Sequence, residues 1–181
     1  LGLINRALDI GAYAVIVTLV NSKEDAEKAV CASRYPPKGI RSWGPRRPML
    51  RDPDYADTAN AEVMIIPQIE TELALRNLED IVTTEGINAV FLGPMDLSMS
   101  LGVFRQFDNP EFLKAVETVV STCEAHNVSP GLLAPAGPVE TGIQQGFKLI
   151  SLGGDLSLLA QSVTSIIRNA RSMVDASARQ I

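Results

Sequence analysis

The sequence of 181 residues contains little cysteine and a single histidine, and both scarcities narrow the kinds of site that it can build. The two cysteines, Cys31 and Cys123, fall inside predicted helices, so we expect buried, reduced thiols rather than a disulfide. His126 lies between a predicted helix and the strand after it, which is the wrong end of the strand for catalysis, and we expect it to be structural. A zinc site built on cysteine or histidine has no support.

Long apolar runs and an excess of positive charge are also missing. No stretch approaches the roughly 18 consecutive apolar residues that indicate a membrane span, and the first residues lack the basic start of a signal peptide. Lysine and arginine total 16 against 21 acidic residues, which argues against nucleic acid and favours small molecules as partners. We therefore expect a cytoplasmic protein with neither a membrane nor a nucleic-acid partner.

Short apolar segments of strand length alternate with amphipathic helical segments along the chain. The predicted strands cover residues 14–20, 63–69, 89–93, 131–134 and 149–152. Helices are predicted from Ser22, with Asp25 as its capping partner, over 74–82, from Asn109, from Pro138 and after residue 152. Residues 1–10 have the pattern of a helix that stops at Gly11. Buried strands separated by helices predict an α/β fold with a parallel sheet.

Two architectures fit these strand-helix units. They can form a complete open, doubly wound sheet, which the pattern alone slightly favours. They can also be the last five units of an eight-stranded TIM barrel, a fold that needs about 250 residues. Both architectures place the ligand site at the carboxyl ends of the strands, so the polar residues at those ends are the candidates for chemistry.

Polar side chains end two of the predicted strands. Gln68 and Glu70 share one face because side chains alternate along a strand, and Asp96 follows a Gly93-Pro94 turn. Neighbouring parallel strands lie about 4.8 Å apart, so Glu70 and Asp96 can reach one ion, and two carboxylates with open positions suit Mg²⁺ or Mn²⁺. In the alternative interpretation, Glu70 caps the next helix and Asp96 braces a turn.

The segment 34–60 is too long for an ordinary connection between a helix and a strand. It carries Arg41, Arg46, Arg47 and Arg51, a local positive charge in an acidic chain. We expect either a lid or binding loop that attracts a carboxylate substrate, or a solvated loop whose arginines face water.

Several segments together resemble the HpcH/HpaI family of class II aldolases. They are PQIET at 67–71, VFLGPMDLS at 90–98, RYPPKGIR at 34–41 and GGD at 153–155. The resemblance spans essentially the whole chain, and it implies a TIM barrel of the phosphoenolpyruvate/pyruvate type rather than an open sheet. It also implies that residues 1–181 form a single aldolase domain that is N-terminally incomplete relative to the family.

The resemblance further implies the site and its chemistry. Glu70 and Asp96 would bind a divalent ion, which is Mg²⁺, Mn²⁺ or Co²⁺, and Gln68 would lie beside the bound oxo acid. Backbone amides of the turn that includes Gly93 and Met95 would receive the substrate carboxylate. The implied reaction is metal-dependent cleavage of a 4-hydroxy-2-oxo acid to pyruvate and an aldehyde through a metal-stabilised enolate, in a homo-oligomer.

The chain also departs from the family pattern. The family's catalytic histidine and carboxylate-binding arginine lie in units that precede the first residue of this chain. Asp9 resembles the aspartate that supports that histidine, and a catalytic role is assigned to it on this basis. A catalytically silent or truncated homologue that only binds an oxo acid, or a member that decarboxylates oxaloacetate, remains an alternative.

Overall fold

The computed structural model describes residues 2–133 and 139–178, and it divides into two compact units, Leu1–Ile150 and Ser151–Ile181. The second unit is dominated by the long helix α9 (Asp155–Ala178), as the sequence pattern after residue 152 predicts. The first unit contains the core and the candidate site. A single domain over residues 1–181 stays a prediction.

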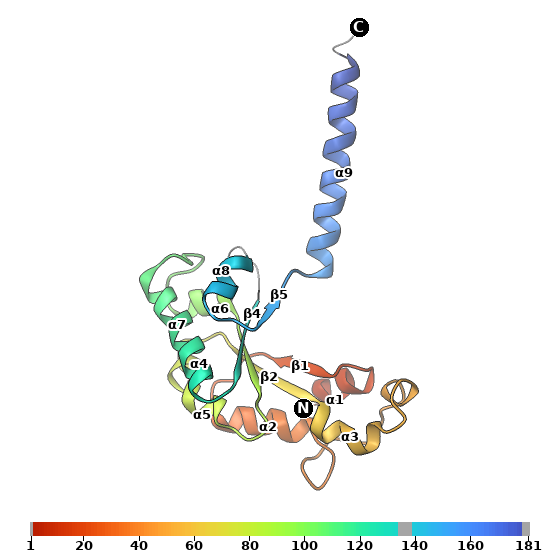
Figure 1. The fold of residues 1–181 in the computed structure, drawn as a ribbon, viewed down its shortest axis with the longest axis vertical. Coiled ribbons are helices and arrows are strands. Elements are labelled where there is room, and N and C mark those ends of the chain that lie inside the picture. The colour runs from red at the N-terminus through yellow and green to blue at the C-terminus, as the bar shows by residue number, and fades with distance from the viewer. Residues whose placement is uncertain (1, 134–138, 179–181) are drawn as a thin grey trace. The chain divides into compact units, whose positions relative to one another are not determined.

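The strands of the sheet lie side by side in the order in which they occur along the chain (Figure 1). They are β1 (Ala14–Val17), β2 (Met64–Ile69), β3 (Ala89–Leu92), β4 (Ser129–Leu133) and β5 (Leu149–Ser151). The pairs β1–β2, β2–β3 and β3–β4 are parallel. A doubly wound sheet reverses its strand order at a switch point, whereas a barrel adds each strand beside the preceding one. The sequential order is therefore that of a barrel, and the open-sheet alternative is wrong.

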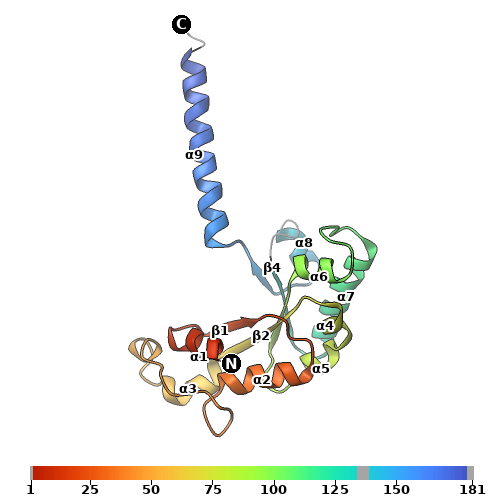
Figure 2. The ribbon, with the colours of Figure 1, turned by 180° about the vertical axis from the view of Figure 1, so that it is seen from behind.

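Helices cover this sheet and supply its core. They are α1 (Gly2–Asp9), α2 (Lys23–Ser33), α3 (Tyr55–Glu62), α4 (Glu72–Arg76), α5 (Leu78–Val82), α6 (Pro94–Ser100), α7 (Pro110–Ala125) and α8 (Val139–Gln144). Helix α2 contacts α5, and α5 contacts α7, so that the three form one layer against β2, β3 and β4 (Figures 1 and 2). None of the described helices combines the length and apolar character required to cross a bilayer.

The core under this layer is apolar. Leu8, Ile65, Ile69, Leu92 and Val119 are fully buried. Each such side chain contributes about 1.5–3 kcal/mol relative to an exposed position. Glu70 directly follows the buried end of β2, so the core fixes the backbone from which its carboxylate projects.

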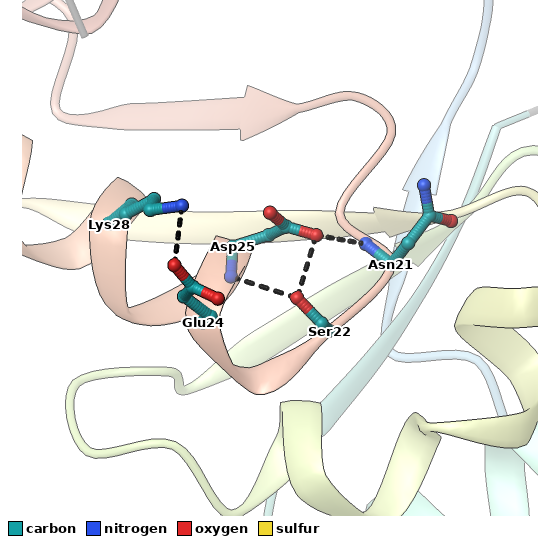
Figure 3. A network of polar contacts seen from close by, with 5 residues as sticks. All are labelled: Asn21, Ser22, Glu24, Asp25 and Lys28. Carbon is teal, nitrogen blue, oxygen red and sulfur yellow. Dashed lines mark hydrogen bonds and ion pairs between the residues drawn. The ribbon is translucent and has the colours of Figure 1, made fainter.

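Local signals in the sequence set the helix starts. Ser22 caps α2 by accepting a hydrogen bond from the amide of Asp25, and the Asp25 carboxylate accepts bonds from the Ser22 hydroxyl and the Asn21 amide (Figure 3). The Asn109 side chain caps α7 through the amide of Glu111. Both predicted helix starts are confirmed.

One predicted strand is shorter in the structure, and one predicted helix is divided into two. The strand predicted over 14–20 stops at Val17, because Leu19 turns into a left-handed conformation with φ of +55°. The helix predicted over 74–82 is interrupted at Asn77, whose side chain donates a hydrogen bond to the Asn21 carbonyl at 2.7 Å. In the fourth unit, β4 begins at Ser129, and the predicted Ala134 and Pro138 lie outside the described residues.

The segment 34–60 is not an open loop, since it contains α3 and a short 3₁₀ turn, Pro48–Leu50. Arg41 lies at its centre with a fully buried side chain and forms an ion pair of 2.9 Å with Asp9. Its guanidinium also donates to the Tyr55 hydroxyl at 3.0 Å. Both expectations for Arg41 are therefore wrong, because it is neither solvated nor free to attract a substrate.

Arg46, Arg47 and Arg51 are exposed, whereas Arg34, the first residue of the segment, is buried. Buried arginines are usually paired with a carboxylate, but Asp9 lies 32 residues from Arg41 in the chain, so this pairing could not be predicted from local sequence patterns.

Candidate metal and substrate site

The carboxylate of Glu70 is held at the carboxyl end of β2. The residue is only 4% exposed. One carboxylate oxygen accepts a hydrogen bond of 2.7 Å from the Leu19 amide, and the other accepts one from the Gln68 side-chain amide. Helix α4 is capped by Thr71 through the amide of Ala74, so Glu70 does not serve as the cap. The alternative helix-capping role of Glu70 is therefore wrong.

The end of β3 approaches this carboxylate at Gly93. The Gly93 amide donates to the Ile69 carbonyl at 3.0 Å. A Cβ atom at Gly93 would lie 2.7 Å from the Gln68 side-chain nitrogen and 3.2 Å from a Glu70 carboxylate oxygen. Only glycine leaves space for this contact, so Gly93 brings the β3 end against the Gln68–Glu70 pair.

Helix α6 begins directly after Gly93 and presents Asp96 in its first turn. The Leu97 amide bonds to the Gly93 carbonyl, while the amides of Met95 and Asp96 precede the first intrahelical bond, as at the start of any helix. The Asp96 carboxylate is exposed, and its side chain makes no hydrogen bond or ion pair with any residue of 2–133 or 139–178. It therefore does not brace the turn.

The donor atoms at these two strand ends decide which kind of metal site they can form. In the described part of the chain, no three histidine, cysteine or acidic side chains come together, which argues against a closed all-protein metal site. Mg²⁺ is usually bound by one or two carboxylates, with waters and substrate oxygens in the other positions. Each Glu70 oxygen accepts one hydrogen bond and keeps a further lone pair. Glu70 and Asp96 therefore suit an ion whose coordination a substrate completes.

The structure does not bring Asp9 to this site. Asp9 ends α1 and precedes β1, so it lies toward the amino ends of the strands, whereas Glu70 and Asp96 follow strands. Its carboxylate pairs with Arg41. The catalytic role assigned to Asp9 stays a prediction.

Two residues beside Glu70 were missed by the sequence analysis. Leu19 supplies the amide that binds the carboxylate, and Asn21 bonds to the Leu19 carbonyl at 3.2 Å. Asn21 could have been noticed as a polar residue following a strand. Leu19 could not, because leucine carries no sequence signal for a left-handed turn.

His126 and the cysteines lie away from the site. His126 ends α7, as predicted, and its ring nitrogen lies 2.7 Å from the Glu79 carboxylate. Cys123 is buried and Cys31 is half-buried, and both are free thiols, so the expectation of burial holds only for Cys123.

The model of the HpcH/HpaI aldolase/citrate lyase family matches residues 2–162. This chain belongs to that family. The match confirms the resemblance drawn from the sequence, and the HpcH/HpaI chain is an α/β protein with part of a TIM barrel.

Individual proteins that are similar in sequence and in structure agree with this family assignment. The chain is 34% identical over 168 residues to the 5-keto-4-deoxy-D-glucarate aldolase of Salmonella paratyphi C, covering 91% of this chain and 66% of that protein. A crystal structure of an HpcH/HpaI aldolase/citrate lyase family protein from Burkholderia cenocepacia J2315 matches with a TM-score of 0.82 and 29% identity, covering 94% and 69% of the two chains. Macrophomate synthase matches with a TM-score of 0.79 and 26% identity, covering 93% and 62%. The chain thus spans slightly less than two thirds of the curated relative.

Proposed function

We propose that this chain carries the metal-binding part of an aldolase that cleaves a 4-hydroxy-2-oxo acid to pyruvate and an aldehyde. The observation that carries the proposal is the buried Glu70 carboxylate, oriented through both oxygens at the carboxyl end of β2 and adjoined by the β3 end that leads to Asp96. Burial of a carboxylate is costly, and no cationic side chain of residues 2–133 or 139–178 pairs with Glu70, which supports a bound cation at this position.

Each residue has a role in this proposal. Glu70 and Asp96 hold the ion, which is Mg²⁺ or Mn²⁺, with Co²⁺ as a further candidate. When bound, the ion acts as a Lewis acid that stabilises negative charge developing on the oxo acid. Gln68 orients Glu70 and lies beside the oxo acid. The amides of Met95 and Asp96 receive the substrate carboxylate at the positive end of α6. The amide of Gly93 is already bonded to Ile69, so the contribution of Gly93 is the space that it leaves.

Similarity to the relatives supports a substrate class for this proposal. The likeness to a 5-keto-4-deoxy-D-glucarate aldolase favours an oxo acid derived from a sugar acid. A member of the family that decarboxylates oxaloacetate, which the sequence resemblance also allows, stays a second candidate. A homo-oligomer and a cytoplasmic location stay predictions.

The test is calorimetric titration of the purified chain with Mn²⁺ in the presence of oxalate, an analogue of the pyruvate enolate. We expect one site that Glu70→Gln or Asp96→Asn weakens by at least tenfold. Glu72→Gln is the matched control, because Glu72 is an exposed carboxylate two residues from Glu70 and is paired with Arg76 on its own helix. Binding that survives both site substitutions would refute the metal assignment.

A folded chain that binds no Mn²⁺ would instead support the silent-homologue alternative. A chain that binds the ion is then assayed for release of pyruvate from 5-keto-4-deoxy-D-glucarate and from oxaloacetate. These two substrates separate the aldolase from the decarboxylase.

A further inference from the structure

The turn between β1 and α2 has an unusual backbone conformation. Leu19 has φ of +55°, a left-handed value that residues other than glycine, asparagine and aspartate rarely adopt. Its side chain does not explain the conformation, because Leu19 is 64% exposed and gains little from packing. Left-handed leucine persists only where its surroundings impose it, and such residues cluster at functional sites.

The conformation directs the Leu19 amide toward the candidate metal site. The amide donates to a Glu70 carboxylate oxygen at 2.7 Å, a short, charge-assisted hydrogen bond. The other oxygen of Glu70 is held by Gln68. The two donors together fix the plane of the carboxylate, and one of the two depends on the left-handed turn.

Asn21 holds this turn in place from several sides. Its side chain donates to the Leu19 carbonyl at 3.2 Å and accepts a hydrogen bond from the hydroxyl of Thr71, the residue after Glu70. Its carbonyl accepts from the Asn77 side chain at 2.7 Å. Its amide donates to Asp25 in the cap of α2 (Figure 3). Asn21 thereby connects the turn after β1 to the end of β2.

We infer that Leu19 and Asn21 are positioning residues that set the orientation of the Glu70 carboxylate for metal binding. The inference deepens the proposed function and rests on it for its metal readout. Leu19 acts through its backbone amide and Asn21 through the turn. Outer groups that orient a metal ligand typically change metal affinity by about 10–100-fold when they are removed.

The first test compares two substitutions at Leu19 by titration with Mn²⁺ and oxalate. Leu19→Gly removes the whole side chain but adopts the left-handed conformation freely, so we expect affinity within about twofold of the parent. Leu19→Val keeps an apolar side chain but disfavours that conformation, so we expect affinity at least about tenfold weaker. Parental affinity in Leu19→Val would overturn the inference. Thermal unfolding in EDTA establishes that both variants fold.

The second test needs no metal and measures hydrogen exchange at the Leu19 amide in EDTA. We expect protection in the parent and at least tenfold faster exchange in Glu70→Ala, in Leu19→Val and in Asn21→Asp, because aspartate keeps an acceptor for Thr71 but cannot donate to the Leu19 carbonyl. An unprotected Leu19 amide in the parent would overturn the positioning role. If the parent binds no Mn²⁺, the proposed function fails, and this measurement still decides whether Leu19 orients Glu70.

Discussion

Replacing Gly93 by alanine introduces a methyl group between the ends of β2 and β3, where the structure has no space for one. The new Cβ would lie 2.7 Å from the Gln68 side-chain nitrogen, 3.0 Å from the Glu70 Cβ and 3.2 Å from a Glu70 carboxylate oxygen. The φ of Gly93 is −98°, a value that any residue can adopt, so the effect is steric rather than conformational.

The neighbours determine the size of the effect. The Gln68 amide lies at the end of a flexible side chain and can move away, which breaks its hydrogen bond to Glu70. The Glu70 Cβ is attached to a buried backbone and can move little. Overpacking of this kind costs about 1–3 kcal/mol of stability, and a hydrogen bond to a charged group contributes about 1.5–3 kcal/mol. If the carboxylate loses the hydrogen bond from Gln68, the loss of that hydrogen-bond energy corresponds to about a tenfold to hundredfold loss of metal affinity.

The assay combines urea unfolding with the titration of Mn²⁺ and oxalate. Gly2→Ala serves as the control, since a Cβ at Gly2 would meet nothing within 4 Å, and we expect it to leave the metal affinity unchanged and not to lower the free energy of unfolding, because alanine favours helix α1. Gly93→Ala should lower both the free energy of unfolding and the metal affinity. If it binds Mn²⁺ within twofold of the parent, the close approach of the two strand ends does not control the site.

Two further predictions concern the rest of the first unit. Arg41→Ala should lower the free energy of unfolding by about 3–5 kcal/mol in urea titrations, because it leaves Asp9 and the Tyr55 hydroxyl without their buried partner. A loss below about 1 kcal/mol would contradict the stabilising role of this ion pair. Burial raises the pKa of the Cys123 thiol to about 12, so below that pH the thiol stays protonated and unreactive. We expect a thiol reagent at pH 8 to label Cys31 in the folded protein and Cys123 only after unfolding, and equal labelling of both in the folded state would refute the burial.

The sequence predicted those features that depend on neighbouring residues. The caps of α2 and α7 were read from Ser22 and Asn109, because a cap requires only the residues of the first turn. The position of Glu70 at the end of β2 was also predicted, since an apolar strand followed by a polar residue is a local pattern. The choice of barrel over open sheet came from the family resemblance, because the strand-helix alternation is common to both.

Contacts between distant segments were decided by the tertiary structure alone. The spatial order of the strands, the burial of Arg41 against Asp9 and the space left by Gly93 all join residues far apart in the chain. The left-handed turn at Leu19 was also decided by the tertiary structure. Glu70 accepts from the Leu19 amide and Asn21 donates to the Leu19 carbonyl, and these two bonds hold the turn in place. By itself, the sequence determined which residues are the candidates for binding a metal ion. Only the fold fixed their orientation, because that depends on hydrogen bonds and close contacts that sequence periodicity does not encode.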